Sequence, residues 1–332
     1  MWFETSFPRQ RNLRSIMKTF IFDKTQTVCD IGGVKVGGQP GANPTVLIGS
    51  MFHKGDKLLA NRKEGKFDKD AARAHLRRLE ELSVQTSMPA MVDIVGNTPE
   101  EFSRYIEFIS AETKLPICID AWRPEVRIEA ARVAAGAGLL GKLVYNSLNL
   151  WNPKLEAEIE EIADIGVRHV ILAVFDEADK LASGRIKALE KLLPAVEKSR
   201  FASVLVDTTV MNVAAMAFSL QAGFEIKGHY GLPVGCSPAN GTYMWEQLRK
   251  LRSRDVFAGA DSAAHGIAAL LWSDFLFYGP LTGSDRVFAA AATAESIKAM
   301  FVYADSGRLP LEQSHPVRKL LPDFIKQLES EA

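Results

Sequence analysis

Residues 89–121 read PAMVDIVGNTPEEFSRYIEFISAETKLPICIDA, a pattern of one strand, one helix and a second strand. Both strands are short apolar runs rich in β-branched residues, and they end near Val95 and at Ala121. Between them, residues 98–110 have the 3.6-residue periodicity of an amphipathic helix, and Thr98 is a suitable N-cap. Two strands that are joined by such a helix usually lie parallel in one sheet, so this unit indicates an α/β fold.

The same alternation of strand and helix continues in both directions along the chain. Further strands are predicted at TVLIGSMF ending at Phe52, KLVYNS ending at Ser147, HVILAVFD ending at Asp176, ASVLVDTT ending at Thr209, FEIKGHYG ending near Gly231 and DFLFYG ending at Gly279. Further amphipathic helices are predicted at residues 68–82, 124–135 and 153–165. Eight strands in this arrangement predict a (β/α)8 barrel, the TIM-barrel architecture.

The remaining segments are expected to lie outside the strands and helices of this barrel. Residues 1–17 carry three arginines and are expected to be a loose N-terminal extension, while residues 18–332 form one barrel domain because no linker interrupts them. The segment CDIGGVKVGGQPG, residues 29–41, is predicted to be a hairpin that plugs the bottom of the barrel. Residues 316–331 are predicted to form a helix on the outside.

The bulk composition argues against several classes of protein. An apolar fraction of 47% is typical of a globular chain, and 40 basic against 40 acidic residues give no charge that would attract nucleic acid. Three widely spaced cysteines fit a reducing compartment, so a cytoplasmic location is expected. The longest apolar run, residues 267–281, is shorter than the ~20 residues of a spanning helix, so no membrane segment is expected.

Polar side chains follow most of the predicted strands at their C-terminal ends, the face that holds the active site of a (β/α)8 barrel. They are Asp93, Asp120, Asn146, Asp176 and Asp207, and the loop GLPVGCSPAN after the seventh strand adds Ser237 and Asn240. Any single aspartate could equally well cap the helix that follows it. As a set, these acceptors predict one pocket for a planar ligand rich in N–H donors, such as a pterin.

Three stretches carry a resemblance to a known family: FIFDKTQTVCDIGGVKVGGQPGANPTVLIGSMF at 20–52, GKFDKDAA at 65–72 and GLPVGCSPAN at 231–240. They are similar to the methyltransferases that include the H subunit of tetrahydromethanopterin S-methyltransferase and the bacterial methyltetrahydrofolate:corrinoid methyltransferases. The likeness runs from about Phe20 almost to the end of the chain. More remotely, the polar strand ends resemble the pterin-binding barrels, a group that also contains dihydropteroate synthase.

The resemblance implies a role for each matching residue. Asp120, Asn146 and Asp207 would hold the pterin, and Asn240 would lie close to its N5, a place for which Ser237 is the alternative. Asn240 is the implied catalytic group that stabilises N5, and Asp207 or Asp93 would take part in a path for the proton.

The implied reaction is transfer of a methyl group between N5 of tetrahydrofolate and the cobalt of a corrinoid, such as cobalamin, on a partner protein. The alternatives are the H subunit of a tetrahydromethanopterin methyltransferase complex and another pterin enzyme related to dihydropteroate synthase. The scattered histidines lack the spacing of a metal site, so no metal ion of the chain's own is expected. Related barrels are often dimers, which makes a homodimer the expected assembly.

Tryptophans near the predicted loops allow a further hypothesis. Trp122, Trp151, Trp245 and Trp272 could shield a corrinoid from water. Aromatic side chains near barrel loops more often pack inside the fold or at oligomer contacts, so the sequence favours that role for them.

Overall fold

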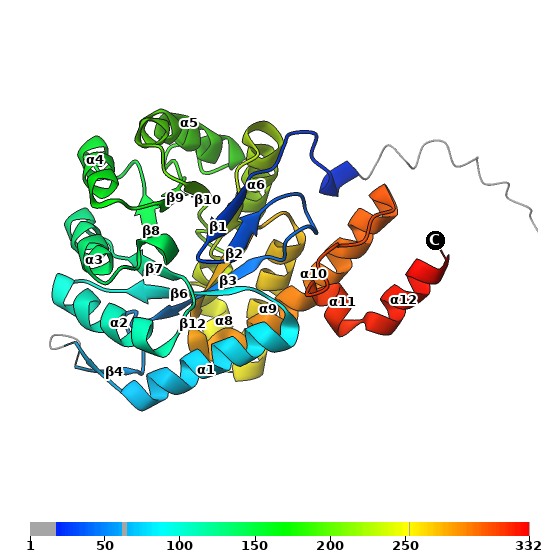
Figure 1. Cartoon of the computed structure of the whole chain (residues 1–332), viewed down its shortest axis with the longest axis horizontal. Coiled ribbons are helices and arrows are strands. Elements are labelled where there is room, and N and C mark those ends of the chain that lie inside the picture. Colours follow the sequence, from blue (N-terminus) through cyan, green and yellow to red (C-terminus); the bar gives the residue numbers. More distant parts are fainter. Residues whose placement is uncertain (1–17, 62–64, 252, 332) are drawn as a thin grey trace, which may run out of the picture.

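The computed structural model describes residues 18–61, 65–251 and 253–331, and the predicted extension 1–17 lies outside this part of the chain. Eight parallel strands close into a barrel, in which each strand pairs with the next along the chain and the last pairs with the first (Figure 1). The strands are β3 (Val46–Met51), β6 (Ala90–Val95), β7 (Ile117–Asp120), β8 (Leu143–Leu148), β9 (His169–Ala173), β10 (Ser203–Asp207), β11 (Val234–Cys236) and β12 (Phe275–Pro280). The predicted (β/α)8 barrel is confirmed.

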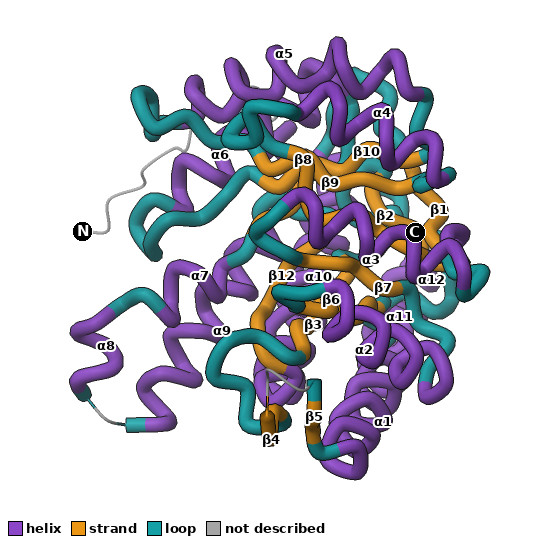
Figure 2. The backbone as a smooth tube through the Cα atoms, turned by 90° about the vertical axis from the view of Figure 1, so that its left-hand side faces the viewer, coloured by secondary structure: helices purple, strands orange, loops and turns teal. Residues whose placement is uncertain are grey.

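Helices surround the strands, as the second view of the backbone shows (Figure 2). The longer ones are α1 (Lys69–Thr86), α2 (Pro99–Glu112), α3 (Pro124–Gly136), α4 (Leu155–Ile165), α5 (Ala182–Ser199), α6 (Met216–Tyr230), α9 (Arg254–Leu270) and α10 (Ser284–Ser306). Shorter elements are η2 (Lys18–Phe20), η4 (Leu140–Lys142), η5 (Leu281–Gly283), α7 (Pro238–Tyr243) and α8 (Glu246–Lys250), with β4 (Leu59–Asn61) and β5 (Lys66–Phe67) as a small antiparallel pair. The four helices predicted by range agree with α1 to α4 to within a few residues.

The C-terminal segment forms two helices rather than the single one predicted. They are α11 (Pro316–Leu320) and α12 (Pro322–Glu331), which lie outside the barrel with α11 against α10 (Figure 1). Leu321 leaves the helical conformation at φ −130° and ψ 51°. The ring of a proline disfavours helical geometry in the preceding residue, so Pro322 ends one helix and begins the next.

The predicted hairpin is also confirmed, and it fills the N-terminal end of the barrel. β1 (Val28–Ile31) and β2 (Val34–Gly37) pair in antiparallel fashion. Cys29, Ile31 and Val36 are buried and pack against apolar side chains that point into the barrel from seven of its strands. The hairpin therefore closes this end of the barrel, while the opposite end remains available for a site.

The seventh barrel strand is not where the sequence placed it. FEIKGHYG belongs to α6, whose buried residues include Leu220, Gly223 and Lys227 at helical spacing, and Gly231 ends this helix in the left-handed conformation. The strand is β11, only three residues long with Gly235 in its centre. A Cβ on Gly235 would lie 2.3 Å from the Phe275 carbonyl oxygen, so close strand packing requires a residue of weak β-propensity.

Leu281–Ser306, which spans η5 and α10, is long and apolar enough to cross a membrane by length and composition alone. Half of its most apolar window is buried in the fold, and α10 packs against α9 and α1. Its buried face also carries Glu295 and Lys298, whose side chains pair at 2.7 Å. Packing of a barrel helix accounts for its apolar character, and the expected absence of a membrane segment stays a prediction.

Candidate active site

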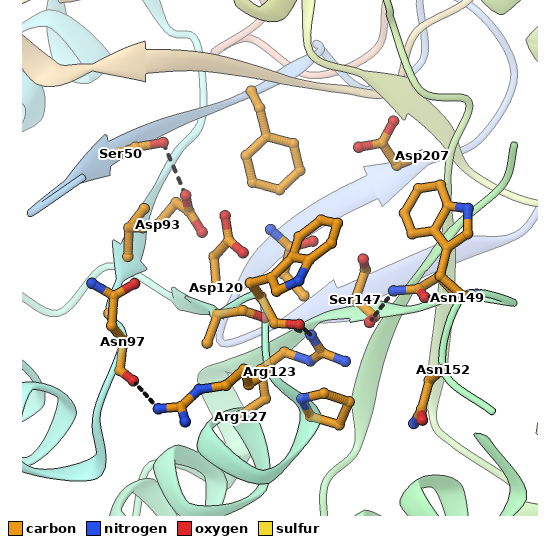
Figure 3. A pocket seen from close by; sticks show the side chains of 18 of the residues that line it. Ser50, Asp93, Asn97, Asp120, Arg123, Arg127, Ser147, Asn149, Asn152 and Asp207 are labelled. Carbon is orange, nitrogen blue, oxygen red and sulfur yellow. Dashed lines mark hydrogen bonds between the residues drawn. The ribbon is translucent and has the colours of Figure 1, made fainter. Parts of the chain in front are cut away.

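A cavity of about 660 Å³ opens at the C-terminal ends of the barrel strands (Figure 3). Its volume lies within the range of small-molecule sites. Of the polar residues predicted to form a site, all but Asp176 line it: Asp93, Asp120, Asn146, Asp207, Ser237 and Asn240. Because these residues come from β6, β7, β8, β10 and the segment after β11, the closure of the barrel is what brings them together.

Asp93 is the least exposed of the carboxylates that line this cavity. It is 2% exposed, and the Ser50 hydroxyl donates a hydrogen bond of 2.9 Å to its Oδ2. Burial raises its pKa well above the usual range for an aspartate, and the charge of Asp120 adds to this effect. Hydrogen bonding from Ser50 and Asn146 opposes the rise in pKa. Asp93 is therefore the carboxyl of the site best able to hold a proton.

Asp120 and Asp207 are partly exposed and face the same space from different strands (Figure 3). Burial raises the pKa of Asp120 to about 6, although the Arg127 guanidinium acts in the opposite direction. Burial likewise raises the pKa of Asp207 to about 6, opposed by a hydrogen bond of 2.7 Å from the Thr209 backbone N–H. At neutral pH both side chains can therefore accept hydrogen bonds as carboxylates, and protonation lies within about one pH unit.

Asn240 enters the cavity from α7, immediately after β11. Gly241 follows it, and a Cβ there would lie 2.9 Å from the backbone nitrogen of Val213. The missing side chain lets α7 approach the loop that follows β10, which brings Asn240 to the cavity that also contains Asp207. Asn240 is exposed, and no other described residue hydrogen-bonds its side-chain amide, whereas Ser237 is 8% exposed. Asn240 is thus the more accessible hydrogen-bond donor of the two.

Asp176 does not belong to this site, contrary to the sequence prediction. β9 ends at Ala173, so Asp176 lies in the following loop, where its Oδ1 accepts a hydrogen bond of 2.8 Å from the Ala178 backbone N–H. The apolar run of the predicted strand continues through the buried residues Val174 and Phe175, which belong to the loop. A buried loop and the end of a strand look alike in such a run.

A buried ion pair beside the cavity was not predicted from the sequence. Arg127 of α3 and Glu158 of α4 are paired at 2.7 Å, with side chains 3% and 1% exposed. The Tyr145 hydroxyl and the Asn152 amide also donate to Glu158, at 2.5 and 2.7 Å. The signal was present, because both charges occupy the apolar stripe of their helices: Arg127 lies three and four residues before buried alanines, and Glu158 lies between Leu155 and Ile162.

Other predicted features can be placed as well. Trp272 packs against Phe224 and donates to the Thr19 carbonyl oxygen, before β12 and away from the cavity. Trp122 and Trp151 line the cavity, while Trp245 does not. Among residues 18–61, 65–251 and 253–331, no three metal-ligating side chains gather into a group, and the expected absence of a metal ion stays a prediction.

The raised carboxyl pKa values predict how stability depends on pH. The folded protein favours the protonated form of Asp120, because its pKa is about 6 in the fold and near 3.8 in the unfolded chain. The stability that Asp120 contributes is therefore complete below pH 3.8 and is lost as pH rises through about 6. The free energy of unfolding of Asp120→Asn, relative to that of the wild type, should therefore be higher at pH 8 than at pH 5 by roughly 1–3 kcal/mol. Urea denaturation of the wild type and Asp120→Asn at both pH values measures this difference. Equal differences at the two pH values would contradict the raised pKa.

The sequence of the chain matches one protein family over most of its length. Residues 24–307 match the family described as tetrahydromethanopterin S-methyltransferase MtrH subunit. A protein of Methanothermobacter thermautotrophicus that is named as the H subunit of tetrahydromethanopterin S-methyltransferase is 34% identical over 313 residues, which cover 91% of this chain and 100% of the relative. The protein of the same name from Methanosarcina acetivorans is 31% identical over 316 residues, covering 91% and 99%.

Solved structures with a similar fold include dihydropteroate synthases. The enzyme of Xanthomonas albilineans with 4-aminobenzoic acid has a TM-score of 0.56 and 20% identity, covering 83% of this chain and 99% of the other. The Yersinia pestis enzyme with a pterine–sulfa conjugate has a TM-score of 0.58 and 16% identity, covering 83% and 100%. At such identities the likeness concerns the fold alone: this chain has the same kind of (β/α)8 barrel as the dihydropteroate synthases.

Proposed function

Because the chain belongs to the family of tetrahydromethanopterin S-methyltransferase MtrH subunits, we propose that it transfers a methyl group between N5 of a reduced pterin and the cobalt of a corrinoid on a partner protein. Its relatives carry tetrahydromethanopterin in their names. This supports tetrahydromethanopterin as the pterin, rather than the tetrahydrofolate that the resemblance first implied. Family membership also favours methyl transfer over the chemistry of a dihydropteroate synthase.

The observation that carries the proposal is the set of hydrogen-bond acceptors that line the cavity. Asp120, Asn146 and Asp207 line the same space from three strands. The amino and ring N–H groups of a pterin form a row of donors, and a carboxylate can accept two of them in parallel. Asp120 and Asp207 have pKa values of about 6, so they are largely ionised at neutral pH and can accept these bonds.

The chain must also help N5 to release the methyl group. A tertiary amine is a poor leaving group until its nitrogen gains a hydrogen bond or a proton, and a reduced corrinoid supplies the nucleophile. Asn240 can donate a hydrogen bond that strengthens as negative charge develops on N5. It cannot supply a proton, so the proton must reach N5 by another route. Asp93, with its raised pKa, and Asp207 lie in the same cavity and can hold or relay one.

Methyl transfer can be measured directly from the cobalt spectrum. The full chain is mixed with Co(I) cobalamin and either methyl-tetrahydromethanopterin or methyl-tetrahydrofolate, and formation of methylcobalamin is followed by absorbance. We expect transfer from at least one of the two, and faster transfer from the tetrahydromethanopterin derivative. Failure to form methylcobalamin from either would overturn the proposed function.

The assembly is open to a simple measurement as well. A homodimer and a cytoplasmic location stay predictions, while the word subunit in the names of the relatives supports a complex with other chains. Size-exclusion chromatography with and without a corrinoid protein separates a homodimer from a mixed complex. A shift to a larger species only when the corrinoid protein is present would support the complex.

A further inference from the structure

Asp120, Asn146 and Asp207 form what we call the acceptor-lined floor of the cavity, and the cavity extends beyond it to a rim of different chemistry. Trp122, Arg123, Trp151 and Lys154 line it from the loops that follow β7 and β8. We call these four residues the aromatic–basic rim. The floor of acidic and amide groups matches a pterin ring, whereas the rim offers aromatic faces and positive charge. A cavity of about 660 Å³ also has room for a ligand larger than a bicyclic ring.

The two tryptophans of the rim expose their side chains to solvent and lie close together. Trp122 is 85% exposed and Trp151 44% exposed, and their ring centroids lie 6.4 Å apart with planes inclined by 20°. An indole that stays exposed buries little apolar surface, so it stabilises the fold little. Two exposed indoles in the wall of a cavity therefore indicate a surface that binds a ligand. Near-parallel rings at this spacing can accept another aromatic ring on an exposed face.

One buried ion pair holds both loops of the rim. Arg127 donates to the carbonyl oxygens of Ala121 and Trp122, the latter at 3.2 Å. Its partner Glu158 accepts a hydrogen bond of 2.7 Å from Asn152, which adjoins Trp151 in the other loop. The same network of hydrogen bonds therefore holds both loops from which the two tryptophans extend.

Arg123 and Lys154 supply the positive charge of the rim and can donate hydrogen bonds to a ligand. The Arg123 Nη2 donates a hydrogen bond of 2.8 Å to the Asn97 carbonyl oxygen, which fixes the guanidinium at the cavity wall (Figure 3). Lys154 is exposed in the neighbouring loop. Glu125, which also lines this part of the cavity, carries the opposite charge. Arginine presents five N–H donors, so one bond to Asn97 leaves most of them for an anion.

We infer that the aromatic–basic rim binds the substituent of the pterin, with an aryl ring against Trp122 and Trp151 and an acidic chain between Arg123 and Lys154. This inference rests on the proposed function, because it assigns the part of the same substrate that lies outside the acceptor-lined floor. Tetrahydrofolate and tetrahydromethanopterin both carry an aryl group followed by an acidic chain. The rim recognises that shared chemistry.

Binding measurements with and without the substituent test the inference. Isothermal titration of the full chain compares methyl-tetrahydrofolate, methyl-tetrahydromethanopterin and an N5-methyl-tetrahydropterin that bears only a methyl group at C6. We expect Trp122→Ala to weaken binding of at least one of the two tailed pterins about tenfold and that of the tail-less pterin by less than about twofold. Trp122→Phe, which keeps an aromatic face, should stay within about threefold of the wild type.

Two further variants check the charge and the position. Arg123→Gln combined with Lys154→Gln should weaken binding of the tailed pterin and flatten its dependence on salt, because an ionic contact is screened by salt. Trp245→Ala is the matched control, since Trp245 is 41% exposed but does not line the cavity. It should leave the Kd of all three pterins unchanged.

The outcomes separate this inference from the proposed function. If the tail-less pterin binds and the tailed pterins gain nothing in the wild type, the rim assignment is wrong while the floor assignment stands. If Trp122→Ala slows transfer to cobalamin and leaves the Kd of every pterin unchanged, the tryptophan contacts the corrinoid and the rim assignment is again wrong. If no methylated pterin binds the wild type, the proposed function fails and the inference fails with it.

Discussion

Asn240→Ala is expected to lower the rate of methyl transfer about a hundredfold and to change the Kd of the pterin by less than about fivefold. A hydrogen bond to N5 matters most when the methyl group is leaving, so its loss affects the transition state more than the bound substrate. Single-turnover formation of methylcobalamin at saturating pterin gives the rate, and titration gives the Kd. A rate and a Kd that both match the wild type would exclude Asn240 from the reaction.

Ser237→Ala provides the matched control for this experiment. Both residues line the cavity after β11, and Ser237 is the alternative candidate for the position near N5. Because Ser237 is 8% exposed and Asn240 is exposed, we expect Ser237→Ala to change the rate by less than about threefold. A hundredfold loss in Ser237→Ala, with a normal Asn240→Ala, would exchange the two roles.

Glu158→Gln is expected to lower the free energy of unfolding by about 3–5 kcal/mol, because it leaves the buried Arg127 guanidinium without its counter-charge. Glu161→Gln is the matched control on the same helix, since Glu161 pairs with Arg132 at the surface, where their side chains are 45% and 47% exposed. Such a surface pair contributes about 0–1 kcal/mol. Urea denaturation at neutral pH measures both variants.

A double variant shows whether charge is the cause. Arg127→Met in the background of Glu158→Gln removes the unpaired charge, so it should recover part of the lost stability. An effect of Glu158→Gln no larger than that of Glu161→Gln would contradict the importance of the pair. Because the pair also supports the loops of the aromatic–basic rim, the single variant should weaken binding of the tailed pterin more than that of the tail-less one.

The sequence predicted those parts of the fold that have a strong periodic pattern. Seven of the eight barrel strands and the hairpin lie where apolar runs and turn residues indicated. The seventh strand was misplaced because β11 contains only three residues with glycine in the centre, while FEIKGHYG is apolar enough to resemble a strand. A strand this short is fixed by its neighbours in the barrel rather than by its own propensity.

The same contrast applies to the cavity. Asp120, Asn146 and Asp207 could be placed from the sequence because they lie at or near the C-terminal ends of strands, and these ends meet at one face of a barrel. The aromatic–basic rim could not be placed, because the spacing of Trp122 and Trp151 depends on the three-dimensional course of two loops. Asp176 was wrongly included because the apolar run before it continues beyond β9.

The hairpin of β1 and β2 has a consequence for kinetics. In the described part of the chain, it occupies the N-terminal end of the barrel, and the cavity opens at the opposite end. If a pterin lies at the floor and a corrinoid protein covers the mouth, the pterin must arrive first, and it cannot leave until the protein has moved away. A compulsory order of binding then follows from this arrangement, and kinetics would show it as competitive inhibition between the methylated and the unmethylated pterin only.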